Sequence, residues 1–170
     1  ADGLVLTPRT RPCRFGGWYR NWARGYAWYM LGMTRTWIEL SENGFGGLAG
    51  MDEVAAEIRR IADVAMHWRL PGKLWACYLD IPETEVETSG SSGIAAALAL
   101  GAKNGLLPTQ MLAVAEEALA ALIGYLTPDG LLGGVSQHNA GGETLQNSGY
   151  RVLSQMGMGL MAQLYGAVRA

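Results

Sequence analysis

The sequence predicts an all-α fold built from helical hairpins. Apolar residues recur at three- and four-residue spacing over several long stretches, and joints rich in glycine, proline and asparagine separate those stretches. No run of alternating apolar and polar residues is long enough to suggest a strand ladder. The chain has 170 residues, of which 49% are hydrophobic and 16% charged, so it can bury a core of its own. We therefore expect one domain over residues 1–170.

The first helix is expected to follow an irregular N-terminal segment. Residues 1–17 carry two prolines and scattered arginines with no sustained period, which is typical of an ordered loop. Asn21 is a good N-cap residue, so a helix should begin at Trp22 and continue to about Leu40. The turn-forming segment 41–50, SENGFGGLAG, then ends it.

A second helix is expected over residues 51–70, where Pro71 and Gly72 stop it. Its apolar positions lie three and four residues apart: Val54, Ile58, Ile61, Val64, Ala65 and Trp68. Its other face is charged, so this helix should lie on the outside of the fold, and His67 on it should be structural.

The third helix should be enclosed on every side. Residues 94–102, IAAALALGA, are small and apolar nearly all round, which lets neighbouring helices approach closely. The segment 74–87 before it has an extended, β-like pattern, and TSGSSG supplies residues for an N-terminal cap. Glu87, Thr88 and Ser89 are accordingly assigned to the cap.

Two more helices complete the expected set of five. One covers 108–126 and is closed by TPDG, and the last covers 150–168 after a polar, glycine-rich loop at 131–149. Enclosed and amphipathic helices alternate along the chain. This alternation predicts a two-layer helical barrel of inner and outer helices, with loops that open at one end.

Composition limits the function classes. A net charge of −2 with scattered signs argues against nucleic acid or an anionic membrane as partner, and no apolar run could span a bilayer. Cys13 and Cys77 lie far apart without metal-ligand spacing, so we expect free, partly buried thiols, no metal and no cofactor. Position 1 is Ala and no signal-peptide pattern follows, so we expect a processed chain or a piece of a longer one, with a cytoplasmic location as the working hypothesis.

The aromatic segment 18–31, WYRNWARGYAWYML, is the first candidate site. Arg24 and Trp28 lie four residues apart and project from one helix face, with Trp22 at the helix start. A guanidinium can bind a carboxylate through two hydrogen bonds while an indole packs on the sugar that carries it. No acidic residue stands at helical spacing from Arg24, so an inward-facing Arg24 should need an external anion. The alternative is that the tryptophans are core residues and the arginines surface charges.

Three segments resemble one enzyme family. They are W-x-R-G-x-x-W at 22–28, LDIPETEVETSGSSGIAAALALGAKNGLL at 79–107, and DGLLGGVSQ with GYRVLSQMGMGLMAQLYG towards the end. In this order they resemble the unsaturated rhamnogalacturonyl and glucuronyl hydrolases, glycoside hydrolase families 105 and 88. The resemblance implies the C-terminal half of a six-hairpin α/α barrel, because family members are roughly twice as long as this chain.

The resemblance also implies a reaction. These enzymes remove a 4,5-unsaturated uronic acid from the non-reducing end of oligosaccharides by hydrating the vinyl ether. The family's catalytic aspartates and a substrate-binding histidine lie upstream of the Trp/Arg segment, and no residue here matches them. Asp80 is better explained by a capping role in its turn. The chain is therefore expected to carry no catalytic residue and to be inactive alone.

The expected substrate-binding residues lie on the first helix and around the last loop. They are Trp22, Arg24, Trp28, Gln137, His138, Tyr150 and Arg151. The expected partners are an oligosaccharide with an unsaturated uronic acid end and either the missing N-terminal half or a second copy of the chain, because exposed apolar inner faces need a cover. A non-catalytic carbohydrate-binding or assembly module is the alternative function.

Overall fold

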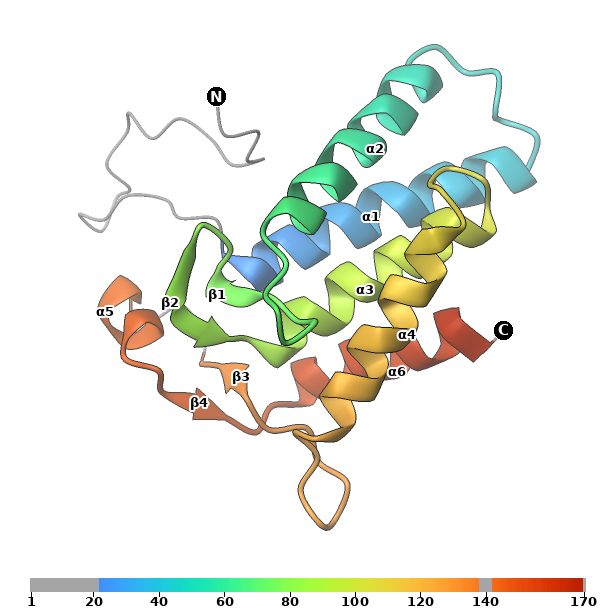
Figure 1. The fold of residues 1–170 in the computed structure, drawn as a ribbon. Coiled ribbons are helices and arrows are strands. Elements are labelled where there is room, and N and C mark those ends of the chain that lie inside the picture. Colours follow the sequence, from blue (N-terminus) through green and yellow to red (C-terminus); the bar gives the residue numbers. More distant parts are fainter. Residues whose placement is uncertain (1–21, 138–141, 170) are drawn as a thin grey trace.

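Three helices that run in the same direction form the centre of the fold. The computed structural model describes residues 22–137 and 142–169, and within them it contains six helices and two small sheets of two antiparallel strands each. The helices are α1 (Ala23–Glu42), α2 (Met51–His67), α3 (Thr88–Lys103), α4 (Gln110–Ile123), α5 (Gly142–Asn147) and α6 (Gln155–Arg169). Helices α1, α3 and α6 lie side by side with α3 in the middle (Figure 1).

The remaining long helices form an outer layer. Helix α2 runs back along α1, and α4 runs back along α3 (Figure 1). Helix α2 carries the expected charged face, with Glu57 and Arg60 paired on it at 2.6 Å. Its inner face is anchored because the Tyr26 hydroxyl donates to the Ile61 carbonyl at 2.9 Å, and burial raises the pKa of that phenol above its ordinary value. The expected all-α, two-layer arrangement of helical hairpins is confirmed.

Helix α3 begins six residues earlier than the sequence predicts. The segment TSGSSG, expected to be a cap, forms the first turns of the helix, and the helix is buried along almost its whole length. Serine and glycine have low helix propensity, so packing rather than local preference decides this start. Gly90 and Gly93 allow the packing, since a Cβ at either position would lie 2.5 Å from a methyl carbon of α1.

The C-terminal region also differs from expectation. Helix α6 begins at Gln155 rather than at residue 150, because Arg151–Val152 forms strand β4 against strand β3 (Val135–Ser136). The segment 131–149, expected to be a loop, contains β3 and the short helix α5, so the described residues hold six helices where five were predicted.

The predicted extended segment forms a β-hairpin. Strand β1 (Ala76–Tyr78) pairs with β2 (Ile81–Val86), and Asp80 lies in the turn between them. Each sheet in the described part of the chain has only two short strands, as expected. His67 ends α2 with an exposed side chain stacked edge-on against Trp68. In the described residues, no helix combines the length and the apolar character that crossing a membrane requires.

Candidate functional site

The N-terminal ends of α1 and α3 meet around the guanidinium of Arg24. Arg24 stands in the first turn of α1 and is only 3% exposed. Its Nε donates to the Ser89 hydroxyl at 2.7 Å, and its Nη2 donates to the Ser136 hydroxyl at 2.9 Å and to the Ser136 carbonyl. The arginine therefore joins α1 to the start of α3 and to β3.

Glu87 supplies the counter-charge. Its Oε1 lies 3.6 Å from Arg24 Nη2, and its side chain is fully buried. The carboxylate accepts hydrogen bonds from the backbone amides of Ser89 at 3.2 Å, Gly90 at 2.5 Å and Ser136 at 2.9 Å, and from the Ser89 hydroxyl at 2.6 Å. It therefore caps α3, as the sequence predicts, and also neutralises a buried arginine.

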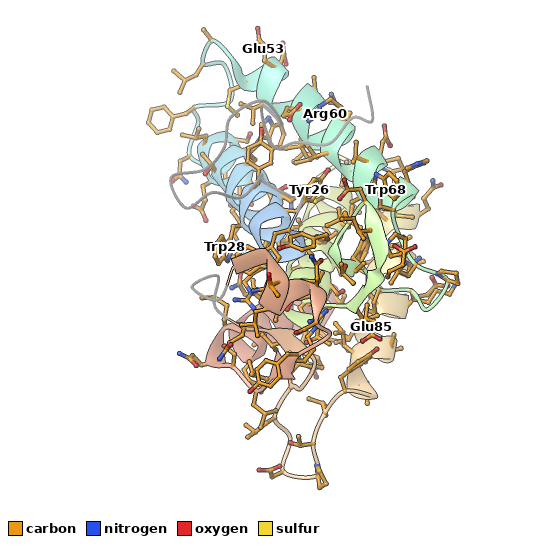
Figure 2. All side chains as sticks on the ribbon, turned by 90° about the vertical axis from the view of Figure 1, so that its left-hand side faces the viewer. Tyr26, Trp28, Glu53, Arg60, Trp68 and Glu85 are labelled. Carbon is orange, nitrogen blue, oxygen red and sulfur yellow. The ribbon has the colours of Figure 1, made fainter. Side chains whose placement is uncertain are left out.

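Two tryptophans lie beside this ion pair. Trp22 immediately precedes α1, and its Nε1 donates to the Ser136 hydroxyl at 3.2 Å. The Arg24 guanidinium lies 4.8 Å from the centre of the Trp22 ring, which meets the Trp28 ring edge-to-face at 5.5 Å. Trp28 is 48% exposed and lies across the molecule from Glu85 of β2 (Figure 2).

The exposed indole forms one wall of a groove between α1 and α6. The groove has a volume of about 400 Å³, and none of its lining side chains is charged. The lining residues are Trp28, Leu31, Gln155, Met156, Gly159, Leu160 and Gln163. An aromatic wall and two lining carboxamides provide stacking and hydrogen bonding together, which is the chemistry that a sugar ring requires.

The β3–β4 strand pair brings the last predicted residues to the same end. Ser136 pairs with Arg151 in the β3–β4 ladder, so Gln137 and Tyr150 flank that pair, and both are exposed. The Arg151 guanidinium donates to the carbonyls of Val86 at 3.1 Å and Tyr150 at 3.0 Å, and also to that of Thr84. Arg151 thus clamps the end of β2 to β4.

Cys77 lies close to the cluster but is shielded. Its side chain is fully buried, and the thiol donates to Oε1 of Gln146 at 3.6 Å. Burial, helped by the Glu87 carboxylate, raises the pKa of this thiol to about 11. The expected free cysteine is confirmed for Cys77; Cys13 lies outside the described residues.

Comparison with known proteins gives the family. The sequence model of Glycosyl Hydrolase Family 88 matches residues 13–165, most of the chain. The chain belongs to Glycosyl Hydrolase Family 88. No curated protein sequence matches it.

Solved structures agree with this family 88 assignment in fold. A possible member of the GH105 family from Salmonella enterica serovar Paratyphi A is 18% identical with a TM-score of 0.77, over 87% of this chain and 39% of the other. A family 105 glycoside hydrolase from C. acetobutylicum is 22% identical with a TM-score of 0.76, and the match covers 95% of this chain and 48% of the other. A family 88 glycosyl hydrolase from Bacteroides vulgatus is 21% identical with a TM-score of 0.73, and the match covers 98% of this chain and 49% of the other.

The family 88 chain therefore spans between about two fifths and one half of the length of these structures. Its three inner helices and two outer helices correspond to about half of an α/α toroid. The sequence-based prediction of a partial α/α barrel is confirmed at the level of the fold.

The structure corrects the expected placement of two arginines in this family 88 chain. Arg24 was expected to face inward and to need an external anion, but it is buried and paired with Glu87 from a distant segment. Arg151 was expected to face a ligand, but its guanidinium is directed at backbone carbonyls. His138 lies outside the described residues, as does the predicted cap Asn21.

Sequence reasoning missed one central residue of the site and understated another. Ser136 receives hydrogen bonds from both Trp22 and Arg24, yet nothing in the segment GGVSQ distinguishes it from an ordinary loop serine. Glu87 was recognised only as a cap. The neutralising role could have been suspected, because a buried cap with a net charge needs a counter-charge.

Proposed function

We propose that this chain supplies the substrate-binding half of a glycoside hydrolase that removes a 4,5-unsaturated uronic acid from the non-reducing end of oligosaccharides. The observation that carries the proposal is the family 88 match over residues 13–165. The exposed face of Trp28 above an uncharged groove is in keeping with an oligosaccharide ligand.

The reaction proposed for the whole enzyme is hydration of the vinyl ether. A carboxylic acid protonates C4 of the C4=C5 double bond and water adds at C5. The hemiketal that results opens, and the glycosidic bond breaks. The reaction needs one carboxyl group that acts first as acid and then as base. We assign that role to none of the described residues, since Glu87, the carboxylate at the centre of the cluster, is already held by four hydrogen-bond donors and Arg24.

The proposed contacts divide into two groups. Trp28, Gln137 and Tyr150 have exposed side chains and are assigned to direct contact with the sugar, and the same role is proposed for His138, which lies outside the described residues. Arg24, Arg151 and Trp22 are assigned to holding that surface in place, because protein groups already accept their hydrogen bonds.

The test combines binding and turnover on the purified chain. An unsaturated uronyl disaccharide should bind with a measurable dissociation constant by titration calorimetry, while the absorbance of its conjugated double bond stays constant. Replacing Trp28 with Ala should weaken binding roughly three- to tenfold, the value of an aromatic stacking contact. The matched control is Tyr165→Ala, which removes an exposed aromatic ring of α6 that does not line the groove. This variant should bind the disaccharide as the parent does.

The outcomes separate the competing functions. Loss of the double-bond absorbance at rates typical of enzymes, roughly one per second or more, would show that this chain carries its own acid. Equal affinity for the saturated disaccharide would indicate a general carbohydrate-binding module. No binding of either sugar would refute the proposal.

A further inference from the structure

We infer that Glu87 is a positioning residue for the sugar-binding surface, acting through Ser136 and Trp22 on Trp28. The inference rests on the proposed function, and it assigns to Glu87 more than the cap of α3. Its basis is the set of contacts that converge on one buried carboxylate.

The first step is that the carboxylate holds the backbone of β3. Glu87 Oε1 accepts from the Ser136 amide at 2.9 Å and from the Ser89 hydroxyl at 2.6 Å. Capping of α3 requires only acceptance from the first amides of that helix, which the Ser89 and Gly90 amides satisfy. The bond to Ser136 is therefore additional to the cap, and it joins β3 to the start of α3.

The second step is that Ser136 orients Trp22. The Ser136 hydroxyl accepts from Trp22 Nε1 at 3.2 Å and from Arg24 Nη2 at 2.9 Å. Since the Ser136 amide is held by Glu87, this hydroxyl has a defined place. The indole of Trp22 is then fixed between the guanidinium at 4.8 Å and the Trp28 ring at 5.5 Å.

The third step is that a neutral side chain cannot replace the carboxylate. Among the described residues, the groups that hydrogen-bond or pair with Glu87 are all donors: three backbone amides, one hydroxyl and one guanidinium. A glutamine would turn its NH₂ towards one of these donors, and a short hydroxyl side chain could cap α3 without reaching β3 or Arg24. The network therefore fits one residue type, an acid with the reach of glutamate.

The experiment compares two variants of the cluster with a core control of comparable destabilisation. Glu87→Thr keeps a residue type that caps helices well but removes the link to Ser136. Ser136→Ala keeps Glu87 and its cap but removes the hydroxyl that holds Trp22. Ile58→Ala, in the buried face of α2, is the control that destabilises without touching the cluster.

Two readouts are measured where each variant is fully folded. The first is the exciton circular dichroism of the Trp22–Trp28 pair, identified by its loss in Trp28→Phe. The second is the dissociation constant for the unsaturated uronyl disaccharide. We expect both Glu87→Thr and Ser136→Ala to lose the exciton signal and to bind more weakly by no more than the roughly three- to tenfold expected for Trp28→Ala, while Ile58→Ala keeps both.

A retained exciton signal in either cluster variant would overturn the inference and leave Glu87 as a helix cap. Loss of the signal in Ile58→Ala would overturn it too, because destabilisation alone would then explain the result. If the parent chain binds no disaccharide, the proposed function fails, while the exciton signal still decides whether Glu87 positions the tryptophan pair. Should Glu87→Thr fail to fold, Glu87→Asp carries the test: it keeps the acid and the helix cap but shortens the reach to Ser136, so it should lose the exciton signal as well.

Discussion

Replacing Arg24 with Met should destabilise the fold by about 3 kcal/mol. The substitution keeps much of the apolar bulk but removes the side-chain charge that pairs with the fully buried Glu87 in the described part of the chain. Breaking a buried ion pair on one side typically costs about 3–5 kcal/mol, since a charge is left without compensation. Four donors remain around Glu87, so the lower end of that range applies.

An exposed ion pair provides the comparison. Arg60 and Glu57 approach to 2.6 Å, closer than the 3.6 Å between Arg24 and Glu87, but their side chains are 43% and 29% exposed. Water already solvates such charges, so Arg60→Met should cost no more than about 1 kcal/mol. Distance alone would rank the two pairs in the opposite order, and burial decides the difference.

The assay is urea and thermal unfolding followed by far-ultraviolet circular dichroism. For a chain of this length, a loss of 3 kcal/mol corresponds to a decrease in Tm of about 8 °C. The double variant Arg24→Met with Glu87→Gln should be less destabilised than the sum of the single variants, by about 1–3 kcal/mol, because no buried charge remains unpaired. Equal costs for Arg24→Met and Arg60→Met, or strict additivity in the double variant, would refute the reasoning.

Two further predictions concern close packing and the buried thiol. Gly90→Ala should destabilise the fold by about 2 kcal/mol or more in urea unfolding, since its Cβ would lie 2.5 Å from a methyl carbon of α1. Gly32 has open space around it, so Gly32→Ala should be neutral or should stabilise the fold by up to about 1 kcal/mol. A larger loss of stability in Gly32→Ala than in Gly90→Ala would contradict the packing argument. Burial raises the pKa of Cys77 from 9.0 to about 11, so the stability from the protonated thiol is complete below pH 9 and is lost as the pH rises through 11. The stability difference between the parent and Cys77→Ala should therefore shift by up to about 3 kcal/mol in favour of the variant over that window; no shift would show that the thiol is solvated.

The amphipathic helices could be predicted because their signal is local. The apolar period in 51–70 predicted the helix that the structure places at Met51–His67, and the pattern after Trp22 predicted Ala23–Glu42. Each residue in such a pattern contributes through neighbours three or four positions away, so the sequence contains the whole argument. The enclosed position of α3 was predictable for the same reason, since its residues are apolar on every face.

The ends of α3 and α6 were decided by contacts with other elements. Six serine, threonine and glycine residues at the start of α3 are helical because α1 packs against them, and residues 151–152 are extended because they pair with β3. Local propensity argued for a cap in the first case and for a helix in the second. Burial and ladder hydrogen bonds are non-local, and they outweighed it.

The sequence by itself determined that Arg24 and Trp28 share a helix face, that Glu87 caps the helix after it, and that the chain carries the fold of this enzyme family. Only the tertiary structure decided which anion Arg24 meets. Residues 24 and 87 are far apart in the chain, and their attraction depends on a separation that periodicity does not encode. The close approach of α1 to α3 at Gly90 brings the two charges together in a buried place, where an ion pair satisfies both.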